Sequence, residues 1–427
     1  MHTRAETERK YEAGSVADLP ALDAVAGVTV SGVDTQTLEA VYFDTPGLRM
    51  ARAGITLRSR TGGDDAGWHL KVPADGDTRD EMHMPLDAAA PDAPPARLLA
   101  LTAGYTRGDE VCAVATVTTT RRRSELVDDG GTVLAHVTDD RVDATALPSD
   151  ASGPTGVGPS SRWREVEVEL AEDTDPELLD QVDEQLRRHG VRRAQHASKL
   201  ARVLDVAAPR PLQPAATAGD AVLAYVRAQV ARLLRYDLRT RRNDEDAVHQ
   251  MRVTTRRLRS VLRVYGRVLD RGRTGRVADE LKWLGQRLGP ARDLEVMDAH
   301  ERAEVEALPR ELVVGPVSAR LTRHFSTVET AARRGVERTL VSRRYLRLLD
   351  SLERVVADPP LTDRAHRPAA KELPRHVRRA YRKVARRVAA VDDTTDQPAR
   401  DGALHSARKA AKRLRYGCEV AVPVVGR

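Results

Sequence analysis

Cysteine and aromatic residues are scarce in this chain of 427 residues, and their scarcity excludes several classes of protein. The two cysteines, Cys112 and Cys418, lie far apart and in no ligand-like spacing, which excludes a disulfide framework and a thiolate metal site. Aromatic residues make up 3% of the chain and leave few platforms for stacking nucleic-acid bases. No apolar run approaches the about 20 residues of a membrane span, and the N-terminus lacks the apolar core of a secretory signal. We therefore expect a cytoplasmic protein that does not enter the membrane.

Lysine is also scarce, because the chain has 62 Arg and only eight Lys. The first 205 residues keep three lysines, which are Lys10, Lys71 and Lys199. In a chain that favours arginine, a retained lysine indicates a site where a compact ammonium group is needed instead of a planar guanidinium. The count by itself leaves chance placement open as the alternative.

The two halves of the chain carry opposite net charges. Residues 1–205 contain 23 Lys and Arg against 36 Asp and Glu, whereas residues 206–427 contain 47 against 27. The net charges of −13 and +20 predict two domains with different electrostatic roles. Between them, the Pro- and Ala-rich segment AAPRPLQPAATAG continues neither a helix nor a strand, so we place a linker at 206–218.

The acidic half has the alternation of β-strands, with charged residues sharing one face of each strand. Carboxylates recur at a period of two in 5–13 and again in 164–170. On an open sheet such faces are simply solvated. In a closed barrel they would line a lumen that cannot pack as an apolar core and that needs cations and a polyanion for neutrality. Carboxylates would then hold Mg²⁺ or Mn²⁺, and arginines and lysines would bind phosphate oxygens.

The residues that form this pattern resemble the motifs of the CYTH family, the triphosphate tunnel enzymes. The motifs occur in order over essentially all of residues 1–205: Glu6-Thr-Glu8-Arg-Lys10, Leu57-Arg-Ser-Arg60, Leu70-Lys71-Val-Pro, Arg79-Asp-Glu81, the arginines 121–123, Asp139-Asp140, Glu165-Val-Glu-Val-Glu169 and Ser198-Lys199-Leu-Ala-Arg202. The resemblance implies an eight-stranded antiparallel tunnel that binds a triphosphate-like polyanion with a divalent metal. It also implies hydrolysis of the terminal phosphoanhydride bond.

The resemblance, together with the charges, assigns functional roles to individual residues. The catalytic residues that we expect are Glu6, Glu8, Lys10 and Lys71. The expected metal ligands are Glu6, Glu8, Glu165, Glu167 and Glu169, with Asp139 as either a ligand or a turn residue. The expected phosphate-binding residues are Lys10, Arg58, Arg60, Lys71, Arg79, Arg121, Arg123, Lys199 and Arg202.

The basic half shows the 3.6-residue period of amphipathic helices, and basic residues recur at a fixed helical spacing. Like-charged faces repel one another unless an anion lies among them, so the spacing predicts a polyanion-binding surface. Its expected residues are His249, Arg252, Arg256, Arg259 and Arg263; His376, Arg379, Lys383 and Arg386; and His405, Arg408, Lys412 and Arg415. A fourth stripe is expected at Arg232, Arg235, Arg239 and Arg242, and the offsets of 144 and 156 residues between stripes indicate a duplicated helical hairpin.

A net charge of +20 would also suit nucleic acid, but the shortage of aromatic residues argues against base readout. The motifs around His249, the segment 281–293 and the motif around His405 resemble CHAD, a helical family that is associated with polyphosphate. This resemblance covers roughly 219–427, and CYTH followed by CHAD is a known domain order. Only 22 residues follow His405, so we expect the second repeat to be truncated.

The sequence therefore predicts an α+β multidomain protein with an eight-stranded antiparallel β tunnel, flanking helices and a C-terminal all-α duplicated bundle. We expect a hydrolase of inorganic triphosphate or short polyphosphate that uses Mg²⁺ or Mn²⁺. Its helical domain would bind longer polyphosphate, at polyphosphate granules in the cytoplasm. Three alternatives remain open: a non-catalytic polyphosphate scaffold, an organic triphosphatase for nucleoside or thiamine triphosphate, and an adenylate cyclase.

Overall fold

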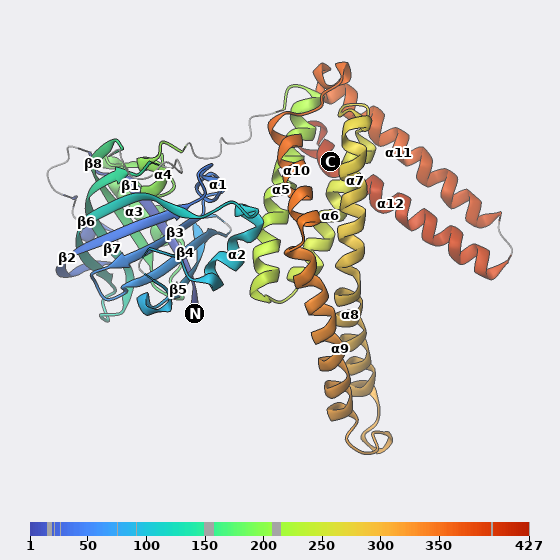
Figure 1. Ribbon diagram of the computed structural model, residues 1–427, viewed down its shortest axis with the longest axis horizontal. Helices are drawn as coiled ribbons and strands as arrows, with labels where there is room; N and C mark the ends of the chain where they lie inside the picture. Colours follow the sequence, from blue (N-terminus) through green and yellow to red (C-terminus); the bar gives the residue numbers. More distant parts are fainter. Residues whose placement is uncertain are drawn as a thin grey trace. The chain divides into compact units, whose positions relative to one another are not determined.

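The computed structural model describes residues 1–14, 19–20, 22–25, 27–74, 76–90, 92–148, 158–206, 215–393 and 396–426. They belong to two compact units, Met1–Arg210 and Pro211–Arg427 (Figure 1). Most of the expected linker, residues 207–214, lies outside the described residues. No described helix is both long enough and apolar enough to cross a membrane.

The first unit is a closed antiparallel barrel, which confirms the predicted tunnel. Its strands are β1 (His2–Glu12), β2 (Thr29–Asp44), β3 (Thr56–Thr61), β4 (Gly67–Pro73), β5 (Thr78–Met84), β6 (Cys112–Val127), β7 (Val133–Ala146) and β8 (Ser160–Leu170). They lie in the order β5-β4-β3-β2-β6-β7-β8-β1, and β1 also pairs with β5, which closes the barrel. A short strand β9 (Arg192–Arg193) adds to β1.

Short helices cover the barrel: α1 (Arg49–Arg52), α2 (Ala96–Thr106), α3 (Glu177–Arg188) and α4 (Lys199–Val203). The buried face of α3, with Val182 at its centre, packs against Val166 and Val168 on the outside of β8. Because α3 covers these valines, the alternate residues of β8 face the interior. On α4, Leu200 belongs to a second apolar cluster that includes Val117.

The second unit is helical, as predicted. Its helices are α5 (Ala218–Arg242), α6 (Ala247–Val264), α7 (Arg271–Arg287), α8 (Gly289–Ala307), α9 (Val317–Leu340), α10 (Arg343–Ala357), α11 (Ala369–Asp392) and α12 (Gln397–Val425). Helices α5 and α6 pack on each other, as do α11 and α12, while α8 and α9 form a long hairpin (Figure 1).

A close crossing joins the two helix pairs where α12 passes α6. A Cβ at Gly417 would lie 3.1 Å from a side-chain carbon of Val264, so glycine allows the helices to approach. Next to this contact, the Tyr265 hydroxyl donates a hydrogen bond of 2.7 Å to the Gly417 carbonyl oxygen. The crossing brings the basic residues of α6, α11 and α12 into one region of the unit.

Candidate functional site

A polar cavity of about 70 Å³ lies inside the barrel. The residues lining it that the sequence predicted are Glu6, Glu8, Lys10, Arg58, Arg60, Lys71, Arg79, Arg121, Glu167, Glu169 and Lys199. The other lining residues are Tyr42, Thr56, Asp65, Glu81 and Ser198. The barrel thus gathers charged residues from strands that are far apart in the sequence.

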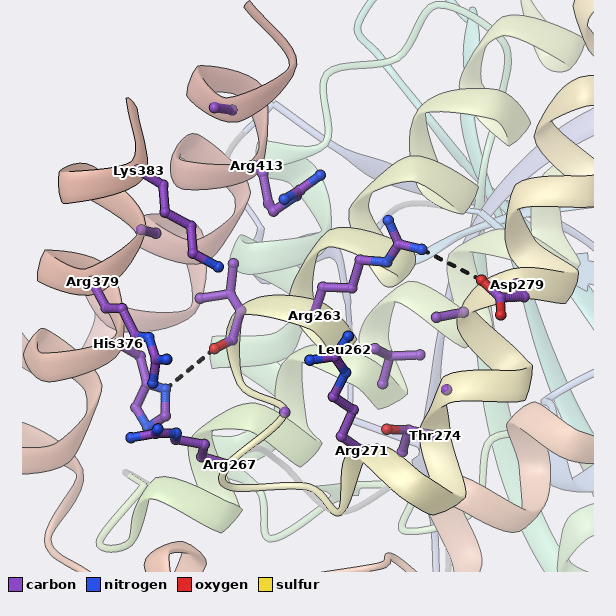
Figure 2. A pocket seen from close by; sticks show the side chains of 16 residues that line it. Leu262, Arg263, Arg267, Arg271, Thr274, Asp279, His376, Arg379, Lys383 and Arg413 are labelled. Carbon is purple, nitrogen blue, oxygen red and sulfur yellow. Dashed lines mark hydrogen bonds and ion pairs between the residues drawn. The ribbon is translucent and has the colours of Figure 1, made fainter. Parts of the chain in front are cut away.

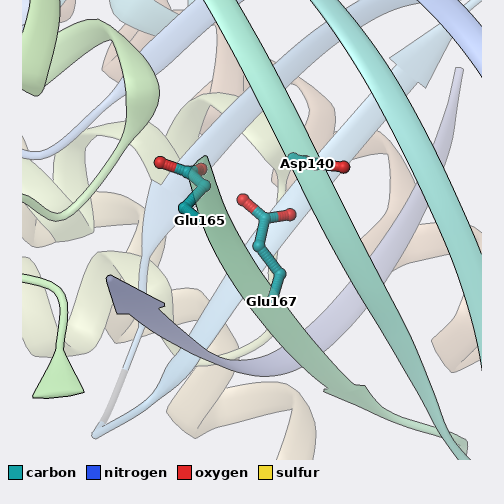
Figure 3. A group of neighbouring side chains, drawn as sticks. All are labelled: Asp140, Glu165 and Glu167. Atoms are coloured by element: carbon teal, nitrogen blue, oxygen red, sulfur yellow. The ribbon is translucent and has the colours of Figure 1, made fainter. Parts of the chain in front are cut away.

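Lys199 is held by three carboxylates beside the cavity. Its Nζ lies 2.8 Å from Asp140, 2.7 Å from Glu165 and 2.8 Å from Glu167. Figure 3 shows the three acidic side chains close together on β7 and β8, and their oxygens lie within 4.8 Å of one another. Burial opposes ionisation of Glu167, but Lys10 and Lys199 hold its pKa well below the usual range. The ammonium group of Lys199 is thus the counterion of these carboxylates.

The other two lysines of the barrel also bridge carboxylates. Lys71 Nζ lies 2.5 Å from Glu6 Oε2 and 3.6 Å from Glu81 Oε1. Lys10 Nζ donates to Glu167 and lies 3.3 Å from Glu8 Oε1. A compact ammonium group fits between two oxygens that approach from different directions, which agrees with the retention of lysine at these positions.

The arginines of the cavity differ in their partners. Arg121 donates to both oxygens of Asp140, at 2.8 and 2.7 Å, and Asp65 forms an ion pair with Arg60. Arg58 instead donates to the Tyr42 hydroxyl at 3.2 Å. Burial opposes the charge of Arg58, but Tyr42 and Glu81 raise its pKa. Within the described residues Arg58 forms no ion pair with a carboxylate, so it can bind an anion without first leaving one.

Two carboxyl groups lack sufficient positive charge around them. Burial and a hydrogen bond with Glu81 raise the pKa of Glu6 to about 8. Burial also raises the pKa of Glu169, and repulsion by Glu8 adds to this shift. Glu8 and Glu169 face each other across β1 and β8. Because carboxylate oxygens are hard donors, these residues fit Mg²⁺ or Mn²⁺, whose charge would restore their ionised form.

The structure places Asp139 away from this site. Asp139 lies opposite Val166 on the outer face of the barrel, where Arg164 Nε donates to it at 2.7 Å. Asp140 lies opposite Glu165 and faces the interior. The sequence interpretation chose the wrong one of two adjacent residues of β7. Asp139 shares the outer face with Val166, which α3 covers, whereas Asp140 shares the inner face with Glu165. Asp140 takes the place of Asp139 among the candidate ligands.

Three other predicted residues lie outside the cavity lining. Arg123 Nη2 lies 3.0 Å from His136 Nδ1, further along β6. The guanidinium of Arg202 stacks on Trp163 at 4.8 Å from the ring centroid. Glu165 accepts a hydrogen bond of 2.5 Å from Trp163 Nε1 and belongs to the buried group around Lys199. Only Glu165 among them contacts the charged network of the cavity.

Some residues of the site were missed in the sequence. Glu81 belongs to the quoted motif Arg79-Asp-Glu81 and shares a strand face with Arg79, but the sequence interpretation assigned it no role. Asp140 is adjacent to the residue that was chosen. Asp65 and Tyr42 carry no signal of this kind, because Asp65 lies in a loop and Tyr42 in a strand with an apolar pattern.

The helical unit contains a larger basic cavity of about 570 Å³. Figure 2 shows its side chains, which come from α6, α7, α11, α12 and the α6–α7 connection. Its cationic residues are Arg263, Arg267, Arg271, Arg379, Lys383 and Arg413. Burial and the neighbouring Arg379 lower the pKa of Lys383, and burial and Arg263 lower the pKa of Arg413. These mutual shifts show a concentration of positive charge that an anion would relieve.

One acidic residue, Asp279, lines this cavity and lies 3.4 Å from Arg263. His376 is buried at its edge, where Nδ1 is 3.2 Å from the Val264 carbonyl and Nε2 is 3.3 Å from Glu372. Both ring nitrogens are engaged within the protein, so His376 joins helices α6 and α11 and does not present a nitrogen to an anion.

The remaining predicted basic residues lie outside this cavity: Arg232, Arg235, Arg239, Arg242, His249, Arg252, Arg256, Arg259, Arg386, His405, Arg408, Lys412 and Arg415. Some of them form a second group, because Arg256 and Arg408 lower the pKa of Lys412 in addition to its burial. Arg256 also donates to the Tyr416 hydroxyl at 3.1 Å.

Several of the predicted basic residues pair with carboxylates, which the prediction from repulsion between like-charged faces did not include. Arg252 lies 3.0 Å from Asp293, and Arg239 and Arg242 each lie 3.0 Å from Asp244. The sequence also missed Arg267, Arg271 and Arg413, which the helix crossings bring to the cavity. No single-helix periodicity can place these three residues together.

Comparisons with known proteins agree with the two-unit fold. A family model for the CYTH domain matches residues 4–204, and one for the CHAD domain matches residues 224–427. Uncharacterized proteins from two strains of Mycobacterium tuberculosis are 42% identical over 431 residues, which cover 96% of this chain and 81% of each relative.

Solved structures resemble parts of the chain. PptA from Streptomyces chartreusis is 24% identical, with a TM-score of 0.41, over 48% of this chain and 76% of that one. The CHAD domain from the plant Ricinus communis is 25% identical, with a TM-score of 0.39, over 50% and 70% of the two chains. A putative adenylyl cyclase from Hippeastrum with a dominant triphosphatase activity is 18% identical, with a TM-score of 0.28, over 48% and 97%.

Proposed function

We propose that this chain, which belongs to the family of proteins that join a CYTH domain to a CHAD domain, is a metal-dependent hydrolase of inorganic triphosphate or short polyphosphate. The observation that carries the proposal is the composition of the barrel cavity, which seven cationic and six carboxylate side chains line. The cations suit phosphate oxygens, whereas the carboxylates would repel them. A divalent metal resolves this conflict, because it binds both.

The residues that would hold the metal are Glu6, Glu8 and Glu169. Burial raises the pKa of Glu6 and that of Glu169, so both carboxyl groups would gain from a nearby cation. Burial also opposes ionisation of Glu8, but Lys10 and Lys71 lower its pKa, so Glu8 offers an ionised ligand beside them. The metal would supply charge neutralisation of phosphate oxygens and activation of a water molecule. Glu165, Glu167 and Asp140 are already balanced by Lys199, Arg121 and Lys10 together, so we place them in a supporting role.

The cationic side chains would bind and orient the phosphate chain. Arg58, whose partner is the neutral Tyr42 hydroxyl, would donate to phosphate without first leaving a carboxylate. Lys10 and Lys71 would share their ammonium protons between phosphate and the carboxylates that hold them now. Positioned donors of this kind stabilise the charge that shifts onto the leaving phosphate during phosphoryl transfer.

The lining of the cavity favours an inorganic substrate over an organic triphosphate. Among the described residues that line the cavity, Tyr42 is the one aromatic residue, and its hydroxyl accepts a hydrogen bond from Arg58. A nucleoside or thiamine ring would need an aromatic or apolar surface beside the phosphates. We therefore rank tripolyphosphate above ATP and thiamine triphosphate, and hydrolysis above cyclisation.

A phosphate-release panel tests the proposal. The full chain is incubated with tripolyphosphate, ATP, thiamine triphosphate and pyrophosphate, each with Mg²⁺, with Mn²⁺ and with EDTA. We expect the fastest release from tripolyphosphate and none with EDTA. Faster turnover of ATP or thiamine triphosphate would point to an organic triphosphatase, and no turnover of any compound would point to a binding protein.

For the helical unit, we propose that the cavity around Lys383 binds longer polyphosphate and holds the protein at cytoplasmic polyphosphate granules. Its concentrated cations and few acidic residues support this role. Binding of long-chain polyphosphate to the full chain should weaken steeply with salt, because neutralising many phosphates releases counterions.

Charge reversal tests this cavity. Arg271→Glu with Lys383→Glu should lower polyphosphate affinity at least about tenfold, since two phosphate contacts become repulsive. The matched control is the double reversal Arg378→Glu with Arg382→Glu, at two exposed positions of α11 that do not line the cavity. Equal losses in both variants would contradict the cavity assignment. Displacement of polyphosphate by duplex DNA at equal phosphate concentration would make the unit a general nucleic-acid binder.

A further inference from the structure

Asp65 differs from the other carboxylates of the barrel cavity. The others lie on strands, whereas Asp65 lies in the loop between β3 and β4 and forms an ion pair with Arg60. The Arg60 side chain is 5% exposed, and that of Asp65 is 62% exposed. The buried guanidinium of Arg60 is therefore paired with a carboxylate, that of Asp65, which can turn into the solvent.

Arg60 depends on an anionic partner. Burial and repulsion by Arg58 and Arg121 lower the pKa of Arg60 to about 9. Such a group is stabilised by any anion that reaches it, whether a carboxylate or a phosphate. Arg60 shares a strand face with Arg58, so both point into the cavity.

Contacts on both sides of Asp65 hold the backbone of the loop, whereas the Asp65 side chain stays exposed. Gly62 and Gly63 have φ angles of +77° and +72°, and a Cβ on Gly62 would lie 2.2 Å from the Thr37 carbonyl oxygen. Beyond them, His69 Nε2 lies 3.0 Å from the Asp65 carbonyl oxygen, and its Nδ1 lies 2.9 Å from Glu81 Oε1. The fold thus holds Asp65 beside Arg60 without burying its carboxylate.

We propose that Asp65 is an internal competitor for anions at the barrel site, because its carboxylate occupies the position at Arg60 that a phosphate group of the substrate would take. The inference rests on the proposed function of this site. An anion must displace Asp65 to reach Arg60, and the cost of this displacement is the same for orthophosphate and for a chain of linked phosphates. Only the chain is also held by the other cations of the cavity, so only the chain binds tightly after meeting this cost.

The test compares Asp65→Asn with Asp64→Asn, which removes the same charge from the neighbouring exposed residue. Calorimetric titration with inorganic tripolyphosphate in EDTA measures binding without turnover. We expect Asp65→Asn to lower the tripolyphosphate dissociation constant about fivefold, the upper range for a partly exposed ion pair. Asp64→Asn should leave the constant unchanged. Asp65→Ser, which also lacks the charge but has a different shape, should reproduce the gain.

A second readout uses turnover with Mg²⁺. Asp65→Asn should lower KM for tripolyphosphate while kcat changes little, and orthophosphate should inhibit this variant more strongly than the wild type. Weaker or unchanged tripolyphosphate binding in both Asp65 variants would overturn the inference and would indicate that Asp65 supports the loop or a metal. If the wild type binds tripolyphosphate but does not hydrolyse it, the proposed hydrolase activity fails, while the binding comparison still decides the role of Asp65.

Discussion

Replacing Lys199 with methionine should destabilise the barrel, because it removes the one cation that contacts all three buried carboxylates and leaves only Arg121 and Lys10 to balance them. The Lys199 side chain is 7% exposed, and its ammonium group lies 2.7 to 2.8 Å from Asp140, Glu165 and Glu167. Methionine keeps the unbranched chain but leaves the carboxylates without this charge. Removing one partner of a buried ion pair costs about 3–5 kcal/mol. For a domain of this size, that corresponds to a fall in Tm of roughly 6–20 °C.

The pH dependence of this loss follows from the shifted pKa values. The pKa values of Asp140 and Glu167 are lowered in the folded protein, so their stabilisation is present above about pH 4 and is lost as the pH falls through the folded values. The pKa of Lys199 is raised, so its stabilisation is present below about pH 10 and is lost at higher pH. The deficit of Lys199→Met should therefore be largest near pH 7 and should shrink towards pH 4, where the carboxyls of the variant become protonated.

Differential scanning calorimetry of the full chain at pH 4, 5.5 and 7 measures this deficit in the transition of the barrel unit. Arg122→Met is the control, because Arg122 is exposed on β6 and loses a surface charge only. We expect the control to stay within about 0.5 kcal/mol of the wild type. A deficit below about 1 kcal/mol for Lys199→Met, or one that does not depend on pH, would refute the reasoning.

Two further predictions concern the chemistry of the cavity. Glu8→Gln should abolish metal-dependent phosphate release without changing the Tm by more than a few degrees, because Glu8 contributes charge and not packing; unchanged release would remove Glu8 from the mechanism. Lys71→Ala should slow tripolyphosphate hydrolysis by at least about tenfold, since each lost charge contact is worth on the order of 2–4 kcal/mol. Lys71→Arg should recover little of the lost hydrolysis rate, because a planar guanidinium cannot take the place of the ammonium group between Glu6 and Glu81. A wild-type rate in this variant would show that the lysine is not specifically required.

The alternation of β8 shows what the sequence of the barrel could reveal. Glu165, Glu167 and Glu169 alternate with apolar residues, and the structure places these apolar residues under α3, so the in-and-out order followed from the sequence. The same rule misled at β7, where Asp139 and Asp140 are adjacent and either could face inwards. Only the pairing of Asp140 with Glu165 across the sheet decides between them.

The helical unit was harder to predict, because its cavity is built at helix crossings. The basic stripe of a single helix predicts which face of that helix carries Arg263 or Lys383, and both residues line the cavity. Arg271 begins a new helix, α7, and Arg413 lies one position beyond the predicted Lys412, so the periodicity of one helix places neither of them at the cavity. The acidic partners of several stripe arginines, such as Asp293 for Arg252, come from other helices and carry no sequence signal.

The most direct test of the central claim is a ³¹P NMR time course of tripolyphosphate with the full chain and Mg²⁺. We expect that tripolyphosphate disappears, that pyrophosphate and orthophosphate form in equal amounts, and that neither forms with EDTA or with Glu8→Gln. A tripolyphosphate spectrum that stays unchanged with Mg²⁺ and with Mn²⁺, while calorimetry shows that the anion binds, would contradict it and would leave the barrel as a binding site.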